Sequence, residues 1–281
     1  MSPKSVNRAS SCLLVWILWA APVRGVDLQQ DTRAAFDHYV ALTETRLIKQ
    51  VSDPAVFLYI NTLPNPERAT AYDFIKRGGI YVGQLSTADD HGHSLVVPDG
   101  WVHHWVGAVY IPRASVADAL KVMQDYDHAQ DSYSNVVIKS HLLKHQGTHF
   151  QASMRLQQHH AITVTLDTIH DITYHKVDGK HWYSDSYSTS VRQVDNAGKP
   201  DEQVLPDGRG DGYLWRIDSF WQFAEQDGGV YVEIEAISLS RWFPAPVKLV
   251  IKPFVNKVEV DSLTDALAST RTAILKRHAA R

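Results

Sequence analysis

The sequence contains 15 histidines, and several of them form close pairs. His91 and His93 follow two aspartates, while His103-His104 and His159-His160 are adjacent pairs. Zinc needs three or four convergent ligands. Adjacent residues of a strand point to opposite faces of a sheet, so such a pair cannot chelate one ion. Because no third ligand is placed by spacing, we predict no metal site and no cofactor.

The motifs of several common enzyme classes are missing from the sequence. It contains no G-x-S-x-G, no G-x-x-x-x-G-K-[ST] and no H-E-x-x-H motif. The one cysteine, Cys12, lies near the N-terminus, which rules out disulfides, cysteine–zinc sites and cysteine nucleophiles in the rest of the chain. We therefore predict no catalytic residue.

Four charged residues, Arg216, Asp218, Glu233 and Glu235, fall on one face of a predicted hairpin. Paired carboxylates can do acid–base chemistry when they are desolvated. Cross-strand ion pairs on a solvated face contribute little to stability. The opposite face of this hairpin is apolar and belongs in a core. We therefore expect the four charges to lie on a solvated outer face.

The composition is that of a folded globular protein. Of 281 residues, 44% are hydrophobic and 21% are charged. The formal net charge is −3, and no basic block stands out, so no nucleic-acid partner is expected. The oligomeric state is left open.

Residues 1–25 have the features of a secretory signal peptide. Lys4 and Arg8 precede the short apolar run CLLVWILWAA, and the segment ends in a small residue, Gly25. The run is shorter than the ~20 residues that a membrane-spanning helix needs. We expect cleavage near Gly25 and export to the periplasm or the medium. An uncleaved anchor is the alternative.

The rest of the chain predicts a helical extension followed by an α+β domain. Apolar spacing indicates a helix over 27–51, and a short strand is expected at 80–85. A strand from Trp101 to Pro112 leads to a helix capped by Ser115. The C-terminal segment predicts a helix that breaks at Pro253 and restarts near Ser262. Between the helix that follows Ser115 and the C-terminal helix, alternating patterns predict strands at 135–145, 148–158, 161–176, 181–194, 213–225 and 230–241.

Two Asp-Gly pairs predict two-residue hairpin turns, at Asp178-Gly179 and at Asp227-Gly228. The first register pairs Val177 with Lys180 and places His170 opposite Tyr187 on an apolar face. Both hairpins then have one apolar, aromatic-rich face that a helix must cover. Such a face can line a cavity for an apolar ligand. The candidate ligand-binding residues are Met154, His170, Tyr174, Tyr183, Tyr187, Trp215, Trp221 and Phe223.

His170 is the one titratable imidazole among these candidates. An imidazole in a pocket can anchor a polar group or transfer a proton near neutral pH. The alternative is a core histidine that is hydrogen-bonded to Tyr187 or to the backbone.

The order strand, helix, about six antiparallel strands and long C-terminal helix resembles the START-like, or SRPBCC, superfamily, and is closest to its exported bacterial members. The stretches that carry this resemblance are 107–136, 163–174 (TVTLDTIHDITY), 212–223 (GYLWRIDSFWQF), 227–241 and 260–274. The resemblance covers about 101–278. It implies the helix-grip fold, in which a curved antiparallel sheet wraps around the C-terminal helix. We therefore divide the chain into a signal peptide (1–25), a helical and strand extension (26–100) and a helix-grip domain (101–281).

The resemblance also implies a pocket between the sheet and the C-terminal helix. Members of the superfamily bind lipids or other hydrophobic molecules, and a minority catalyse cyclisation or dehydration. The leading interpretation is a protein that binds or carries a hydrophobic small molecule or lipid. The alternatives are a cyclase/aromatase-type enzyme that uses a pocket acid/base, and a non-catalytic interaction module with a filled cavity. Transient contact with a membrane is left open.

Overall fold

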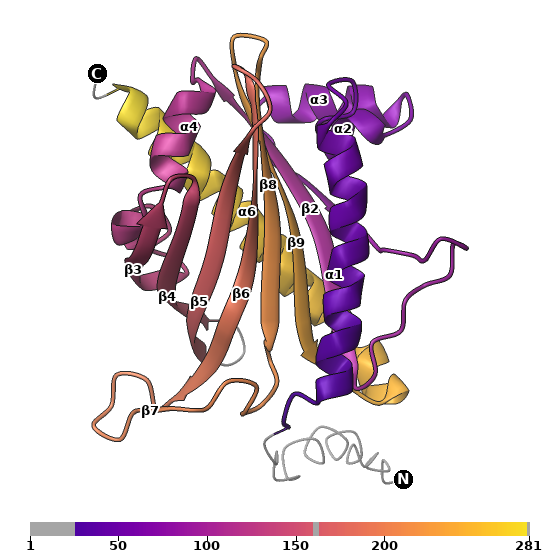
Figure 1. Ribbon diagram of the computed structural model, residues 1–281, viewed down its shortest axis with the longest axis vertical. Helices are drawn as coiled ribbons and strands as arrows, with labels where there is room; N and C mark the ends of the chain where they lie inside the picture. The colour runs from indigo at the N-terminus through magenta and orange to yellow at the C-terminus, as the bar shows by residue number, and fades with distance from the viewer. Residues whose placement is uncertain (1–25, 160–162, 280–281) are drawn as a thin grey trace, which may run out of the picture.

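The computed structural model describes residues 26–159 and 163–279, so the predicted signal peptide and His160 lie outside the described residues. Three helices come first, and a 35-residue helix comes last (Figure 1). The helices are α1 (Gln30–Val51), α2 (Tyr59–Thr62), α3 (Glu67–Lys76), α4 (Val116–Met123), the 3-10 turn η2 (Tyr126–His128), α5 (Ala129–Ser132) and α6 (Ala245–Ala279).

One antiparallel sheet contains every strand named here. Its order is β1-β2-β9-β8-β6-β5-β4-β3, with β7 paired to β6. The strands are β1 (Tyr81–Gln84), β2 (Gly100–Pro112), β3 (Val137–Gln146), β4 (His149–His159), β5 (Thr163–Lys176), β6 (His181–Asp195), β7 (Gln203–Val204), β8 (Arg216–Gln226) and β9 (Gly229–Arg241). These bounds lie close to the predicted ones.

The two Asp-Gly turns differ in the structure. At Asp227-Gly228 both residues have positive φ, as a two-residue type I′ turn requires, and the predicted register of β8 with β9 is confirmed. At Asp178 the carboxylate accepts hydrogen bonds from the backbone N–H groups of Lys180 and His181, 2.7 and 2.9 Å away. This side-chain turn lengthens the loop, and the predicted register is wrong by one residue from the turn to His170 and by two residues beyond the bulge that follows.

His170 therefore pairs with Ser188, next to a bulge, instead of Tyr187. The shift by one residue moves β6 side chains to the other face of the sheet. Tyr183 and Tyr187 consequently lie on the face opposite to His170 and Tyr174.

Helix α6 packs against the face of the sheet that is hidden behind the strands in Figure 1. The predicted apolar stripe of Leu263, Leu267, Thr270 and Ile274 is buried there. The predicted break at Pro253 is wrong, because the helix runs through that residue. Proline removes one backbone hydrogen bond, yet Ile251 and Val255 on either side of it both lie on the cavity side of the continuous helix. This is the helix-grip arrangement that the sequence predicts.

The opposite face of the sheet is also covered. Phe36, Val40 and Leu47 of α1 pack with Phe220 and Leu239 of the sheet in a second buried cluster. In Figure 1, α1 runs along β2 and β9 on the viewer's side. The sheet is therefore the middle layer between α1 and α6.

Helix α4 begins as predicted. The Ser115 hydroxyl accepts a hydrogen bond from the Asp118 N–H, and the Asp118 carboxylate accepts one from the Ser115 N–H. This reciprocal cap satisfies two N–H groups at the helix start.

Candidate functional site: an apolar cavity beneath the C-terminal helix

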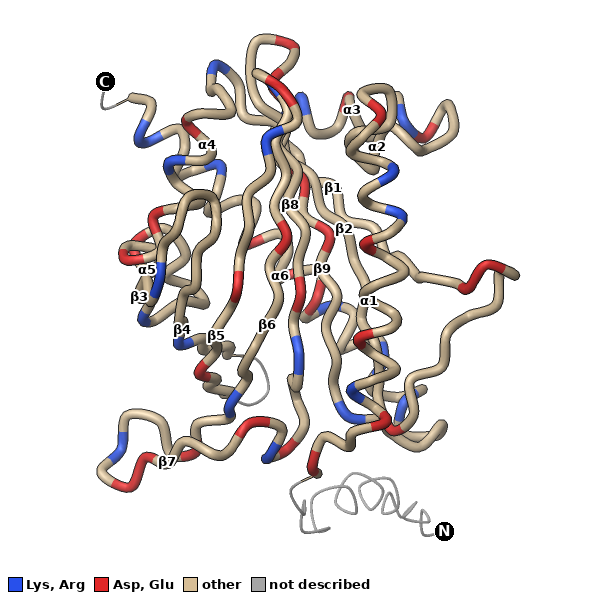
Figure 2. The backbone as a smooth tube through the Cα atoms, in the orientation of Figure 1, with Lys and Arg blue, Asp and Glu red and all other residues tan. Residues whose placement is uncertain are grey.

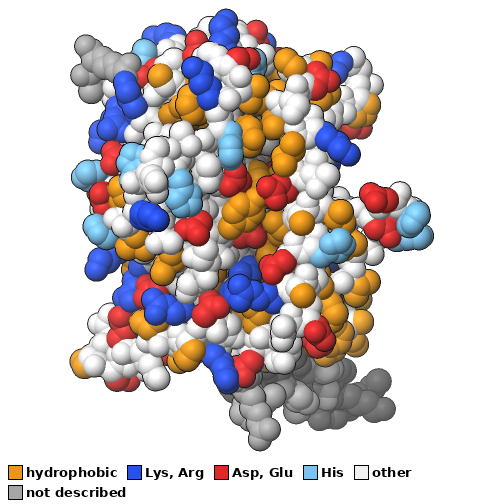
Figure 3. All heavy atoms as spheres, in the orientation of Figure 1, with side chains coloured by type: hydrophobic (Ala, Val, Ile, Leu, Met, Phe, Trp, Pro, Cys, Tyr) orange, Lys and Arg blue, Asp and Glu red, His pale blue; other side chains and the backbone are white. Residues whose placement is uncertain are grey.

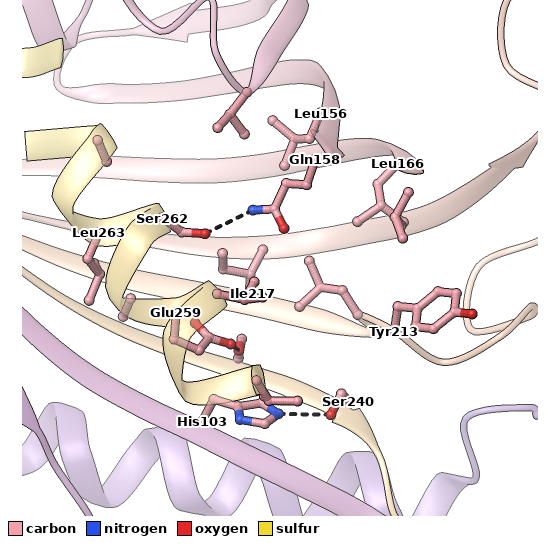
Figure 4. Close-up of a pocket in the computed structure, with 18 of the residues that line it drawn as sticks. His103, Leu156, Gln158, Leu166, Tyr213, Ile217, Ser240, Glu259, Ser262 and Leu263 are labelled. Atoms are coloured by element: carbon pink, nitrogen blue, oxygen red, sulfur yellow. Dashed lines mark hydrogen bonds between the residues drawn. The ribbon is translucent and has the colours of Figure 1, made fainter. Parts of the chain in front are cut away.

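A cavity of about 550 Å³ lies between α6 and the sheet. This volume falls within the range of small-molecule sites in proteins. Most of its wall is apolar and comes from β4, β5, β8, β9 and α6 (Figure 4). The apolar lining includes Val137, Leu156, Val164, Leu166, Ile217, Ile234, Ala236, Ile251, Val255, Val258 and Leu263.

A small polar group interrupts this apolar wall. Glu259 of α6 accepts a hydrogen bond from the Ser238 hydroxyl at 3.3 Å. Ser238 is paired across the sheet with His103, whose Nε2 lies 2.9 Å from the Ser240 hydroxyl. Figure 4 shows Glu259 and His103 on the same side of the cavity. The cavity therefore joins an apolar body to one polar corner.

Burial shifts both titratable groups of this corner toward their neutral forms. Desolvation raises the pKa of Glu259 to about 7, although the Ser238 hydrogen bond acts in the other direction. Desolvation, with a smaller contribution from the charge of Lys248, lowers the pKa of His103 to about 4. His103 is therefore neutral at pH 7, and Glu259 titrates near that pH.

Two further hydrogen bonds connect α6 to the other walls. The Gln158 amide donates to the Ser262 hydroxyl at 3.1 Å, and the Tyr133 hydroxyl lies 2.9 Å from the Thr270 hydroxyl. Ser262, which the sequence predicts as a helix start, instead lies within α6 and serves this cross-cavity contact. The first bond links α6 to strand β4 of the sheet, and the second links it to Tyr133 at the end of α5.

The cavity reaches the surface at the N-terminal end of α6. Tyr213 and Phe254 line it, yet 39% and 49% of these residues are exposed. Trp101 and Phe243 line the same end, and the Lys248 ammonium lies 4.6 Å from the centre of the Trp101 ring. The opening of the cavity is therefore lined by aromatic side chains and flanked by the Lys248 ammonium group.

None of the eight predicted ligand-binding residues lines this cavity. Phe223 is fully buried in the first core cluster, and Met154 and Trp221 are partly buried and pack against that cluster. Tyr174 is also buried, and its hydroxyl lies 2.8 Å from that of Tyr126.

Two other predicted residues, Trp215 and Tyr187, belong to the cluster under α1. Tyr183 and Trp221 border a second cavity of about 110 Å³ beside α1. His170 lies on the same face as Tyr174, and desolvation lowers its pKa to about 4.

His103 and Glu259 were missed as site residues, although the sequence carries a signal for each. His103 lies midway between Trp101 and Trp105, so strand alternation places all three on one face. Glu259 precedes Leu263 by one helical turn and thus extends the apolar stripe. The predicted break at Pro253 and restart near Ser262 hid this second signal.

The predicted solvated face of the β8–β9 hairpin is wrong. Glu233 and Glu235 are each only 1% exposed, and Arg216 and Asp218 are also buried. Figure 2 shows acidic positions of β8 and β9 in the middle of the sheet, beside α1. This charged face is covered by the N-terminal extension. The pattern of apolar residues in the hairpin does not show that a second segment covers its charged face.

These buried carboxylates have partners on the extension. Glu235 contacts Arg46 of α1, and its Oε1 lies 2.6 Å from Nε2 of His104. Glu233 accepts hydrogen bonds from the backbone N–H groups of Tyr59 and Ile60. Among residues 26–159 and 163–279, no group of three or more His, Cys, Asp or Glu side chains could hold a metal ion. No helix in that same part of the chain is long and apolar enough to span a membrane.

Comparison with known proteins gives likenesses of structure only. No family model matches the chain, and no curated protein matches its sequence. A STAR-related lipid transfer protein fragment from Xanthomonas axonopodis is 17% identical, with 69% of this chain and 98% of that chain covered and a TM-score of 0.43. Human StAR-related lipid transfer protein 5 is 11% identical, with 88% and 99% covered and a TM-score of 0.45.

The aromatase/cyclase Zhui from Streptomyces is 9% identical, with 63% of this chain and 96% of that chain covered and a TM-score of 0.41. The fold of this chain is a helix grip, in which one antiparallel sheet holds the long helix α6. At these identities and TM-scores, nothing about the ligand or the activity of this chain follows from the likenesses.

Proposed function

We propose that this protein binds and carries a hydrophobic small molecule or lipid in the cavity beneath α6. The observation that supports this most directly is the cavity itself, with about 550 Å³ of space and a mainly apolar wall. Removing apolar surface of a ligand from water contributes ~25 cal/mol per Å². A filled-core interaction module would not leave such a space. The lipid transfer proteins named above are consistent with this function.

The first test is native mass spectrometry of the protein purified from its own host, followed by extraction into organic solvent. A co-purifying apolar compound supports carriage and identifies its class. A ligand-free mass, together with no thermal shift across a panel of lipids, contradicts the proposal. N-terminal sequencing of the same sample tests the expected export, because cleavage near Gly25 removes the first 25 residues.

Filling the cavity gives a second test with a matched control. Ala266 lines the cavity on α6, whereas Ala41 is exposed on α1, across the sheet. Ala266→Trp should reduce ligand binding about tenfold or more, since the indole occupies the space of the ligand. Ala41→Trp makes the same chemical change and should leave binding unaltered. Equal binding by both variants would show that the ligand site lies elsewhere.

A second candidate function is acid–base catalysis inside the cavity. It is favoured by Glu259 and His103, two titratable groups at one corner of an apolar site. The extracted compound decides between the two functions. Carriage requires that the compound leave the protein unchanged. Catalysis requires a product that differs from the compound in mass or, for a cyclisation, in chromatographic retention, and Glu259→Gln should abolish that product without preventing binding.

A further inference from the structure

Glu259 is partly buried, and it differs from the fully buried carboxylates in having few protein groups to bind. Its one hydrogen bond is the 3.3 Å contact from Ser238. Within the described residues, no Lys or Arg lies within 4 Å of its carboxylate. A carboxylate has about four acceptor positions on its two oxygens. Most of the acceptor capacity of Glu259 is therefore left unused.

The buried carboxylates on the opposite face of the sheet show the usual arrangement. Glu235 has Arg46 and His104 as partners, and Glu233 has two backbone N–H groups. Asp218 accepts from the Ser188 N–H at 2.8 Å and from the Ser188 hydroxyl at 3.3 Å. Buried polar groups are satisfied in most folded proteins. Oε2 of Glu235 is also without a hydrogen-bond partner, but Glu235 has Arg46 and His104 beside its other oxygen. Glu259 has one weak hydroxyl donor and lines the large cavity.

The neighbours of Glu259 cannot complete its coordination. His103 is on the adjacent strand, but its Nε2 already faces Ser240 and its burial keeps it neutral at pH 7. The remaining walls near Glu259 are apolar, with Ile217 and Val258 among them. In Figure 4 the Glu259 carboxyl group points into the cavity, away from the axis of α6. A donor group on whatever fills the cavity can therefore supply a further hydrogen bond to Glu259.

We propose that the ligand of this cavity has a hydrogen-bond-donating head, a hydroxyl or a protonated amine, that binds the Glu259 carboxyl group while its apolar body fills the rest. This inference rests on the proposed function. Above pH 7, where Glu259 is ionised, ligands that end in a carboxylate or a phosphate are disfavoured, because two like charges in an apolar cavity repel each other strongly. A free fatty acid is thus a poor ligand, and an alcohol or amine of the same chain length is a good one.

The test compares three amphiphiles with the same chain: dodecanol, dodecylamine and dodecanoic acid. Each displaces the fluorescent hydrocarbon diphenylhexatriene from the full mature protein at pH 8, where the acid is ionised. Wild type should bind the alcohol and the amine about tenfold more tightly than the acid, the ratio expected for one good hydrogen bond against one repulsion. Comparison of alcohol with amine identifies which donor the site prefers.

The variant Glu259→Gln keeps the size of the side chain and removes its charge. It should reduce the preference for the amine over the acid to about threefold or less. Asp261→Asn is the matched control, since Asp261 also lies on α6 but is outside the cavity lining and pairs with Lys257 at 2.7 Å. This control should keep the wild-type preference. Should Glu259→Gln fail to fold, Glu259→Met replaces it, because an apolar side chain of similar length removes the buried carboxyl group.

Each result is decisive. Equal binding of acid and alcohol by wild type overturns the inference, as does an unchanged preference in Glu259→Gln or an equally large loss in Asp261→Asn. In all three cases the amphiphiles still bind, so the proposed carrier function stands. Failure of every amphiphile to displace the probe contradicts the proposed function itself.

Discussion

At the scale of single residues, Asp218 shows how burial changes the chemistry of a carboxyl group. It lies beneath α1, and its carboxylate accepts two hydrogen bonds from Ser188. Desolvation outweighs these bonds and raises the pKa of Asp218 from 3.8 to about 7. The folded state therefore holds a proton that the unfolded state releases between about pH 4 and pH 7.

This linkage predicts a pH-dependent effect of Asp218→Asn. A raised carboxyl pKa stabilises the fold at low pH, and that contribution is lost as the pH rises through 7. Asparagine cannot ionise, so the variant should gain about 2 kcal/mol relative to wild type between pH 5 and pH 8.5. Urea unfolding at both pH values measures the difference, with the exposed Asp90→Asn as control. A difference that does not change with pH would refute the assignment.

At the scale of elements, α1 is attached to the sheet by a buried ion pair as well as by apolar packing. Arg46 reaches Glu235, whose side chain is 1% exposed, while the Tyr39 hydroxyl lies 2.9 Å from Nδ1 of His104. Burial raises the pKa of Glu235, but His104 and Arg46 outweigh it and hold that pKa below its usual value. Glu235 is therefore ionised and depends on its partners.

Arg46→Ala should consequently destabilise the protein by about 2 kcal/mol, because it leaves Glu235 buried with only His104 beside it. Arg33 is also on α1, but its pair with Asp37 is exposed and 3.9 Å long. Arg33→Ala should cost less than about 0.5 kcal/mol. Urea unfolding of both variants at pH 7 provides the comparison. Equal losses in the two variants would show that the Glu235 pair does not anchor α1.

Local sequence patterns predicted the bounds of helices and strands well, and they predicted how these elements pair and pack less well. Strand bounds, the Ser115 cap and the α6 stripe follow from alternation, capping and helical spacing, which are properties of neighbouring residues. The register after Asp178 depended on side-chain hydrogen bonds within its loop, which an Asp-Gly pair does not reveal.

The candidate site was predicted in kind but not in its residues. A cavity beneath α6 follows from the helix-grip resemblance, whereas its lining depends on which part of the sheet α6 leaves uncovered. The aromatic residues of β5 and β8 that were expected there instead fill the core with α4 and η2. Glu259 of the polar corner lies between Pro253 and Ser262, where the sequence predicts a break in the helix. In the structure α6 continues through Pro253, so the local helix-breaking signal is overridden.

At the scale of the whole molecule, exposed apolar residues collect where the cavity opens. Leu249 and Val250, in the first turns of α6, are 77% and 71% exposed. Phe254 is exposed as well and also lines the cavity. Figure 3 shows hydrophobic side chains gathered at the end of the molecule where Figure 1 places the start of α6. Lys248 and Lys252 lie on the same turns.

Apolar side chains beside lysines are typical of helices that lie at the surface of an anionic bilayer. We propose that these turns contact a membrane while the ligand passes through the opening beside Phe254. The protein should therefore co-sediment with vesicles of phosphatidylglycerol and phosphatidylethanolamine, more weakly as salt is raised.

The double variant Leu249→Ser/Val250→Ser should bind these vesicles about thirtyfold more weakly, since each apolar side chain that no longer enters the bilayer surface loses about 1 kcal/mol of binding free energy. Val96→Ser is the matched control, because Val96 is 82% exposed but lies in the loop between β1 and β2, outside the cavity lining. It should bind as wild type does. If the control loses as much binding as the double variant, or if wild type does not bind vesicles, the ligand must enter from solution instead.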